Sequence, residues 1–263
     1  MQSLQTLHTT NDYRGNWKFI QETTMYSQQN VQKTQPEGDF ADAWRSHREE
    51  SRSLHELLLY PVMIHALAAV KGLSCLLDAG CGTGVLTHAA IEILQPQTTL
   101  ATDLEESLVK EAVARCGDTL VAFAHDLARG IPVPSASVDG ILCSNVLMHL
   151  KVKAAYQFVQ DVGRVLTEEG RAVVAVTHPE WVQRHYASGG VTFPFTTTRL
   201  WGATPVEQTY LDASGYRTLF AGGGLDIIER IELAVPNVAG LSPRYAASVG
   251  TPIYDVYCLQ RTK

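Results

Sequence analysis

The sequence predicts an α/β protein built on a parallel, doubly wound β-sheet. Between residues 73 and 178, apolar runs that end in a polar residue alternate with amphipathic stretches. The apolar runs are nearly continuous, as in strands that helices cover on both faces. Strands that alternate with helices indicate parallel β-α-β units. At 263 residues and 45% apolar composition, the chain is long enough to bury one full core.

The central feature of the sequence is a strand, a glycine loop and a helix. The apolar run 73–78 ends at Asp78, residues 80–84 have the spacing Gly-x-Gly-x-Gly, and residues 85–94 are amphipathic. Such glycines let the backbone turn tightly and let a ligand lie against the main chain. A dinucleotide fingerprint requires Gly or Ala where this chain has Val85. A carboxylate at Asp78 would repel a pyrophosphate, whereas it suits a cationic amine.

The residues Asp78-Ala-Gly-Cys-Gly-Thr-Gly84 resemble the first motif of the class I S-adenosylmethionine-dependent methyltransferases. Further matches follow in order: strands ending at Asp103 and at Asp126, then residues 131–139 and an apolar run to Asn145. The resemblance spans about residues 73–178. It implies a Rossmann-like, doubly wound seven-stranded sheet, mostly parallel with an antiparallel last strand. It also implies S-adenosyl-L-methionine as the cofactor and S-adenosyl-L-homocysteine as its product.

The predicted cofactor site consists of strand-end acids and the glycine loop. A carboxylate at Asp103 can accept hydrogen bonds from both ribose hydroxyls, and the resemblance places Asp126 near the adenine amino group. Taken singly, each acid also has a structural interpretation as a strand-end, capping or turn residue, so the joint pattern carries the prediction. The predicted cofactor-binding residues are Asp78, Gly80, Cys81, Gly82, Gly84, Asp103, Leu104, Asp126, Leu127, Asn145 and Tyr26.

The N-terminal extension, residues 1–70, begins polar and rich in Gln and Thr, with spaced aromatic residues that need a surface to pack on. We expect a helix over residues 16–32 that acts as a lid, with Tyr26 nearest the methionine end of the cofactor. Tyr26 can equally dock this segment to the core. Residues 40–59 predict a charged amphipathic helix, and Pro61 suits the first position of a fresh helix.

The cofactor-binding core, residues 71–178, contains five predicted strands that end on one edge of the sheet. Ligands in such sheets lie beyond the carboxyl ends of the strands. That rule alone selects Asp78, Asp103, Asp126, Asn145 and His178. The predicted strands are 73–78, 98–103, 121–126, 140–145 and 170–178, with helices over 85–94, 105–116 and 151–166.

Residues 179–218 are rich in aromatic residues and too long for a simple connection, so they predict a cap over the substrate site. Within the cap, residues 206–210 and 216–220 can form a hairpin around the turn-forming residues 212–215. Residues 219–263 complete the core sheet, with strands over 225–233 and 253–260. In the family that this chain resembles, the last two strands form a hairpin and the final strand is antiparallel; the ending of this chain is similar.

The expected chemistry is methyl transfer from a sulfonium by in-line displacement. The protein then mainly aligns and desolvates the nucleophile, and no metal is required. A hydroxyl or carbon acceptor gains from a base, whereas an amine or a carboxylate does not need one. The catalytic candidates are His178, at the end of the fifth strand, and His149. His185 and Glu180 are further candidates. Each also has a structural interpretation, His178 in shaping the lid and His149 in packing against the cofactor.

Composition and charge argue against several partners. The net charge is -6 with a pI near 5.8, and no cluster of Lys or Arg stands out, so we expect no nucleic-acid partner. Five cysteines without C-x-x-C spacing predict buried thiols in a reducing compartment and no metal site. Without a signal peptide or a membrane-spanning run, we expect a cytoplasmic protein with no membrane partner.

Three function classes follow from these observations. The first is a methyltransferase of a small-molecule acceptor, and the aromatic cap favours a flat or apolar secondary-metabolite intermediate. The second is a methyltransferase of a macromolecule such as tRNA or protein. The third is a protein that binds S-adenosylmethionine without catalysis. The sequence leaves open which of O, N or C is methylated and whether the chain works as a homodimer.

Overall fold

The computed structural model describes residues 39–187 and 191–263, without the side chains of Asp39 and of residues 49–53. The helix expected over residues 16–32, with Tyr26, lies outside the described residues. Within the described ranges, no helix is both long enough and apolar enough to cross a lipid bilayer.

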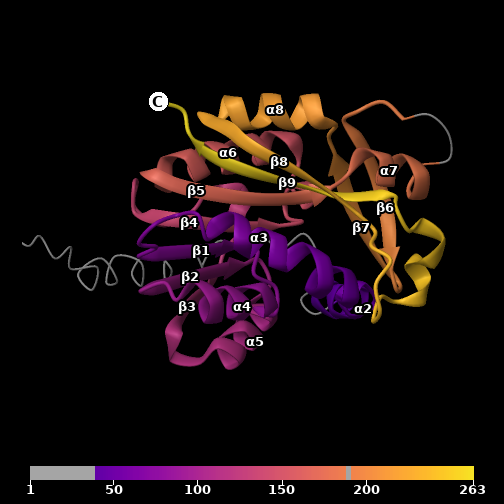
Figure 1. Cartoon of the computed structure of the whole chain (residues 1–263), viewed down its shortest axis with the longest axis horizontal. Coiled ribbons are helices and arrows are strands. Elements are labelled where there is room, and N and C mark those ends of the chain that lie inside the picture. The colour runs from indigo at the N-terminus through magenta and orange to yellow at the C-terminus, as the bar shows by residue number, and fades with distance from the viewer. Residues whose placement is uncertain (1–38, 188–190) are drawn as a thin grey trace, which may run out of the picture. The chain divides into compact units, whose positions relative to one another are not determined.

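Seven strands of the described chain form one sheet in the order β3-β2-β1-β4-β5-β9-β8 (Figure 1). Neighbouring strands among β1 to β5 are parallel, and β9 runs antiparallel to β5 and to β8. This arrangement confirms the predicted Rossmann-like, doubly wound sheet with an antiparallel last strand. The strands are β1 (Cys75–Ala79), β2 (Thr98–Asp103), β3 (Leu120–Ala124), β4 (Val138–Ser144), β5 (Leu166–Thr177), β8 (Leu225–Ala234) and β9 (Pro252–Arg261).

Two groups of helices cover the sheet. α4 (Val85–Leu94) contacts both α3 (Tyr60–Leu67) and α5 (Glu106–Cys116), whereas α6 (Val152–Val165) contacts α8 (Ala213–Gly222). Each helix buries one face; α6, for example, buries apolar residues three or four positions apart. Because helices cover the sheet, all five residues of β1 are buried. The carboxyl ends of the parallel strands remain available to bind a ligand.

The segment before β1 is one continuous helical run. α2 (Asp39–Leu54) passes into the π-helical turn η2 (His55–Leu59) and then into α3, and the backbone stays right-handed helical at each junction. The prediction of a fresh helix at Pro61 is therefore corrected. Pro61 has no backbone N–H to donate, and it stands where the π-helical turn returns to α-helical geometry.

The cap contains a helix and a separate two-stranded sheet. α7 (Pro179–His185) follows β5, and β6 (Phe195–Trp201) pairs antiparallel with β7 (Thr204–Tyr210). The predicted hairpin partner for residues 206–210 was wrong, because residues 213–222 form α8. The Asp212 side chain accepts a hydrogen bond from the Gly215 N–H and caps this helix, so an expected turn former is a helix N-cap.

Candidate functional site

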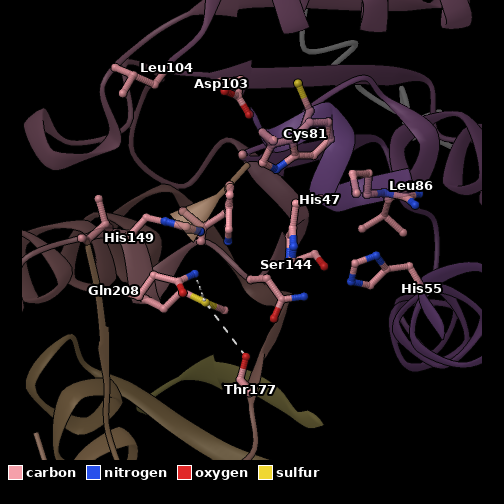
Figure 2. Close-up of a pocket in the computed structure, with 18 of the residues that line it drawn as sticks. His47, His55, Cys81, Leu86, Asp103, Leu104, Ser144, His149, Thr177 and Gln208 are labelled. Carbon is pink, nitrogen blue, oxygen red and sulfur yellow. Dashed lines mark hydrogen bonds between the residues drawn. The ribbon is translucent and has the colours of Figure 1, made fainter. Parts of the chain in front are cut away.

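A cavity of about 710 Å³ lies beyond the carboxyl ends of the parallel strands. Lining residues at the carboxyl ends of β1 to β4 and in the segments after them, as far as Val146, form one wall, here called the strand side. The cap side comprises the lining residues of α2, η2, α3, η5 (Leu147–His149), the end of β5, α7 with Tyr186, the β6–β7 hairpin and residues 243–254. Figure 2 shows Cys81 and Asp103 across the cavity from Gln208 and Thr177.

The structure brings most of the predicted cofactor residues together on the strand side. Gly82 and Gly84 support the loop without lining the cavity, and Tyr26 lies outside the described residues. The predicted residues that line the cavity are Asp78, Gly80, Cys81, Asp103, Leu104, Asp126, Leu127 and Asn145.

The glycine loop has a backbone that other residues adopt only with strain. Gly80, Gly82 and Gly84 have φ values of 85°, 54° and 74°. A Cβ at Gly80 would stand 2.2 Å from the Val146 side chain, and one at Gly84 would stand 2.8 Å from Ala112 of α5. The loop thus needs glycine for its conformation and for close packing. The Gly80 N–H donates to the Thr102 carbonyl at 2.8 Å, which ties the loop to β2.

Asp103 is held by backbone donors on two sides. Its Oδ2 accepts from the Gly82 N–H at 2.9 Å, and its Oδ1 accepts from the Glu105 N–H at 3.1 Å. Burial raises the pKa of Asp103, while these backbone hydrogen bonds oppose the shift. Because each carboxylate oxygen can accept more than one hydrogen bond, a pair of ligand hydroxyls can still be bound.

Asp78 is a buried acid with one unsatisfied oxygen. Its residue exposure is 1%, and its Oδ2 accepts from the Thr87 hydroxyl at 2.6 Å. Its Oδ1 has no hydrogen-bond partner among the described residues. Burial raises the pKa of Asp78 to about 7, and the Thr87 hydrogen bond opposes the shift. A buried, unsatisfied carboxylate oxygen is costly, and a cationic ligand group would relieve that cost. Asp78 therefore fits the positive end of S-adenosylmethionine.

Asn145 and Asp126 complete the strand side. Asn145 has a φ of 56°, which is uncommon for a residue with a side chain, and its buried Oδ1 has no hydrogen-bond partner among the described residues. Such strain is typical of binding sites. Asp126 caps the short turn η4 (Leu127–Arg129) by accepting from the Ala128 N–H at 2.9 Å. The structural and the binding interpretations of Asp126 are therefore compatible.

The cap side is aromatic, and side-chain contacts hold it together. His47 of α2 stacks on Trp201 of β6, with ring centroids 4.5 Å apart. Gln208 is 2% exposed and donates to the Met148 sulfur at 3.2 Å, while the Tyr210 hydroxyl donates to Gln208 at 2.8 Å. Segments far apart in the chain thus build one wall of the cavity.

Three of the histidines that line the cap side, His149, His55 and His185, have lowered pKa values. Burial, assisted by the charges of His47 and Arg199, lowers the pKa of His149 to about 4. Burial and Arg48 lower the pKa of His55 to about 3, and its Nε2 lies 3.1 Å from the Tyr254 hydroxyl. The pKa of His185 is also lowered, chiefly by burial. At neutral pH these three rings are uncharged.

The structure does not bring His178 to the cavity. It is the N-cap of α7: its Nδ1 accepts from the Glu180 N–H at 3.1 Å, and its Nε2 lies 3.1 Å from a Glu232 oxygen. The preceding residue, Thr177, lines the cavity instead. Glu180 does not line it and pairs with Arg184 at 2.9 Å. Of the four catalytic candidates, His149 and His185 line the cavity, whereas His178 and Glu180 do not.

His178, Glu232 and Asp255 lie close enough to one another to hold a metal ion. However, Arg230 donates to both oxygens of Asp255 at 2.9 Å, and its guanidinium is 3.8 Å from Glu232. This guanidinium already supplies the positive charge that the two acids require, so the group reads as a structural ion-pair network.

Most lining residues of the cap side were not predicted. Arg48 belongs to the helix predicted over residues 40–59 as charged and amphipathic, and it is buried and lines the cavity. Exposure alternates along β6 and β7 in the structure, but the sequence of β6 has no matching alternation of apolar and polar residues that would predict the hairpin. The missed lining residues are Trp44, His47, Arg48, His55, Arg199, Gln208 and Tyr254.

Comparisons with known proteins concern the strand side and the fold. A family model described as a methyltransferase domain matches residues 76–170. Malonyl-[acyl-carrier protein] O-methyltransferase of Herminiimonas arsenicoxydans is 35% identical over 98 residues, covering 37% of this chain. The matched part spans only 35% of that relative's length.

Solved structures extend the likeness to most of the chain. An S-adenosylmethionine-dependent methyltransferase from Mesorhizobium loti has a TM-score of 0.60 at 18% identity and covers 76% of this chain and 96% of its own. One from Clostridium acetobutylicum has a TM-score of 0.63 at 12% identity, with coverages of 84% and 99%. A geranyl diphosphate methyltransferase solved with sinefungin has a TM-score of 0.59 at 14% identity, with coverages of 82% and 84%.

Proposed function

We propose that the chain is a class I S-adenosylmethionine-dependent methyltransferase that methylates a small molecule; its fold and the methyltransferase domain matched at residues 76–170 support this. The observation that carries this proposal is the strand side of the cavity. There the unsatisfied oxygen of Asp78, the backbone-held Asp103 and the glycine loop meet at the carboxyl ends of β1 and β2.

The strand side offers a group for each part of the cofactor. Asp78 would face the positively charged amino-acid end, Asp103 would accept from the ribose hydroxyls, and Asp126 with Leu127 would border the adenine. Asn145 offers a further acceptor through its buried Oδ1. When bound, S-adenosylmethionine supplies a methyl group on a positively charged sulfur and leaves as S-adenosylhomocysteine.

The residues around this site would align the acceptor and exclude water. Phe40 and Trp44 of α2 pack with Trp201 and Val206 of the hairpin, so apolar contacts join two segments of the cap side. Displacement at an activated carbon depends mainly on alignment and on removing water from the nucleophile. An aromatic wall that closes over the strand side suits both requirements.

A small-molecule acceptor agrees with the size and charge of the molecule. The cavity of about 710 Å³ falls within the range of roughly 300–1,000 Å³ that small-ligand sites occupy. The net charge of -6 disfavours a nucleic-acid substrate. The aromatic cap side supports a flat or apolar acceptor, such as a secondary-metabolite intermediate. Methylation of a protein or tRNA, and binding without catalysis, are the alternatives that the experiment must separate.

Calorimetry with S-adenosylmethionine, S-adenosylhomocysteine and NAD tests the cofactor assignment. The wild-type protein should bind the first two and not NAD. Asp103→Ala should weaken binding by about 10- to 100-fold, because two charge-assisted hydrogen bonds to the ribose are lost. The exposed Asp118→Ala serves as the matched control and should bind like wild type. Unchanged affinity in Asp103→Ala would contradict the assignment.

Transfer of labelled methyl groups tests catalysis. The protein is incubated with labelled S-adenosylmethionine and either a metabolite extract, bulk tRNA or a protein lysate. Label in the small-molecule fraction supports the proposal. Label confined to tRNA or protein would favour the macromolecular alternative, and tight cofactor binding without transfer to any of the three would favour a binding protein.

A further inference from the structure

The two sides of the cavity carry opposite charges. Among the described lining residues, the acids are Asp78, Asp103 and Asp126, and all three belong to the strand side. The lining cations of the cap side are Arg48 of α2, Arg199 of β6 and Arg244 of the turn η6 (Pro243–Ser248). One further lining cation, Lys151, is exposed and stands directly before α6. A ligand that contacts the cap side therefore meets positive charge.

Arg199 is the cation whose setting is most informative. Its side chain is half-buried and lies flat on Tyr186, with the guanidinium carbon 3.9 Å from the ring centroid. It also donates a hydrogen bond to Tyr210. No ion pair joins Arg199 to a carboxylate within the described residues, whereas Arg48 lies 3.8 Å from Glu56. Tyr186 and Tyr210 thus position the Arg199 guanidinium without neutralising its charge.

The charge of Arg199 affects the pKa of the neighbouring residue His149. Arg199 and His47 add to burial in lowering the pKa of His149, so His149 stays neutral beside Arg199. A partly buried guanidinium that lines a cavity and has no carboxylate partner among the described residues favours an anionic ligand. Carboxylates suit it well, because their two oxygens match the planar fork of the guanidinium.

Within the described residues the cap side has no lining carboxylate. Two of its four lining histidines, His149 and His55, have pKa values of about 4 and about 3. Bases this weak would remove a proton from a hydroxyl or a carbon acid inefficiently at neutral pH. A carboxylate acceptor, with an ordinary pKa near 4, is already ionised and needs no base.

We infer that the methyl acceptor is a small carboxylic acid, that Arg199 binds its carboxylate, and that this carboxylate is the nucleophile. The inference rests on the proposed methyltransferase function. One carboxylate oxygen gives a lone pair to the methyl carbon, and the carbon–sulfur bond breaks with its electrons staying on sulfur. The products are a methyl ester and S-adenosylhomocysteine, and no proton is released. The aromatic residues Trp181, Tyr186 and Tyr254 border the space for the apolar body of the acid.

Binding of matched acids and amides tests the recognition part. Benzoate, cinnamate and octanoate, each beside its primary amide, are titrated into the protein saturated with S-adenosylhomocysteine. We expect at least one acid to bind about tenfold or more tightly than its amide, as one charge-assisted contact predicts. Equal binding of every acid and its amide would overturn the inference.

Substitution of Arg199 shows whether that residue is responsible. Arg199→Gln should abolish the preference for the acid, and Arg199→Lys should retain part of it, because the charge remains while the fork geometry is lost. Arg217→Gln, on the exposed face of α8, is the control and should keep the wild-type preference. Thermal melts and affinity for S-adenosylhomocysteine verify folding and the strand side. An intact preference in folded Arg199→Gln would overturn the inference.

The chemistry of the labelled product tests the nucleophile. A methyl ester releases labelled methanol in mild alkali, whereas methyl ethers, methylamines and C-methyl groups do not. Alkali-labile label in the small-molecule product supports the inference. Alkali-stable label would overturn the inference and leave the methyltransferase function standing. Failure to bind S-adenosylmethionine would instead refute the proposed function itself, so the two failures are distinguishable.

Discussion

The strand side and the cap side of the cavity are held in place by different means. On the strand side, backbone hydrogen bonds and strand register position the functional groups, as with Asp103 between the N–H groups of Gly82 and Glu105. On the cap side, side chains of distant segments position one another, as with His47 on Trp201. Changes on the strand side therefore disturb the core, whereas the cap side can vary around a constant core.

This difference separates cofactor binding from acceptor choice. A cofactor site built on the backbone of β1 and β2 tolerates few substitutions, because the loop conformation and its packing leave no room. The proposed acceptor site, which is lined by side chains of α2 and the hairpin, can change its charge or shape by single side-chain substitutions. In such a molecule, similarity to other proteins on the strand side indicates the type of reaction. The residues of the cap side determine which acceptor is bound.

The largest effect is expected from Gly80→Ala. The new Cβ would clash with Val146 at 2.2 Å, and alanine would be strained at a φ of 85°. We expect a loss of about 3–5 kcal/mol in the free energy of unfolding and loss of measurable cofactor binding. Urea denaturation and calorimetry measure the two effects.

Gly202→Ala is the matched control on the cap side. Gly202 has a φ of 58° in the turn between β6 and β7, and a Cβ there would meet nothing within 4 Å. Only the backbone strain should remain, at a cost of about 1–2 kcal/mol with cofactor affinity unchanged. Equal costs at the two positions would refute the view that packing makes the strand side rigid.

Asp78→Asn should separate stability from binding. Burial raises the pKa of Asp78 from 3.8 to about 7. Between these values the unfolded chain is ionised while the folded, ligand-free protein retains the proton. The wild-type protein should therefore lose stability as the pH rises from about 4 to about 7, by about 1.4 kcal/mol per pH unit. The variant lacks this dependence.

Two measurements at pH 8 should move in opposite directions for Asp78→Asn. The ligand-free variant should be more stable than wild type by about 1–4 kcal/mol, because a buried charge is removed. Its affinity for S-adenosylmethionine should fall by about 10- to 100-fold, because the carboxylate no longer faces the cation. Urea denaturation from pH 5 to 8 and calorimetry test this. A variant that loses both stability and affinity would contradict the proposed role.

The sequence predicted the strand side well because its signals are local. Strand β1, the glycine spacing and Asp103 occupy positions set by one β-α-β unit, so motif and periodicity are sufficient to place them. The doubly wound, seven-stranded and mostly parallel sheet followed from the resemblance. The antiparallel β9 was also predicted, because the chain ending is similar to that of the family fold.

The cap side could not be predicted because its contacts are nonlocal. Asp212 has the same local chemistry as a turn former and as a helix N-cap, and only the spacing of Tyr216, Leu219 and Phe220 distinguishes the helix. His178 satisfies the strand-end rule by its position. Successive side chains along a strand point to opposite faces, however, and it is Thr177 that lines the cavity. Arg48 lies in a charged amphipathic stretch, and its burial follows from tertiary packing that the local sequence does not encode.

The smallest expected effect concerns the link between the two sides. Arg45 of α2 donates to Glu111 of α5 at 2.7 Å and to Ser107 at 3.2 Å, and it also pairs with Asp42 on its own helix. The Arg45 and Glu111 side chains are 33% and 43% exposed. Glu111→Gln should therefore cost only about 0.2–1 kcal/mol. The same pair ties α2, which carries the cap-side residues His47 and Arg48, to a helix beside the glycine loop.

Hydrogen exchange is suited to so small a change. Amides of α2 in Glu111→Gln should exchange about two- to fivefold faster than in wild type, and the difference should shrink in 1 M salt. Glu106→Gln is the control, because Glu106 pairs with Lys110 within α5 at 2.9 Å and should leave α2 unchanged. Identical exchange in α2 for both variants would contradict this prediction. Apolar packing alone would then hold α2 against the strand side, without a contribution from the ion pair between α2 and α5.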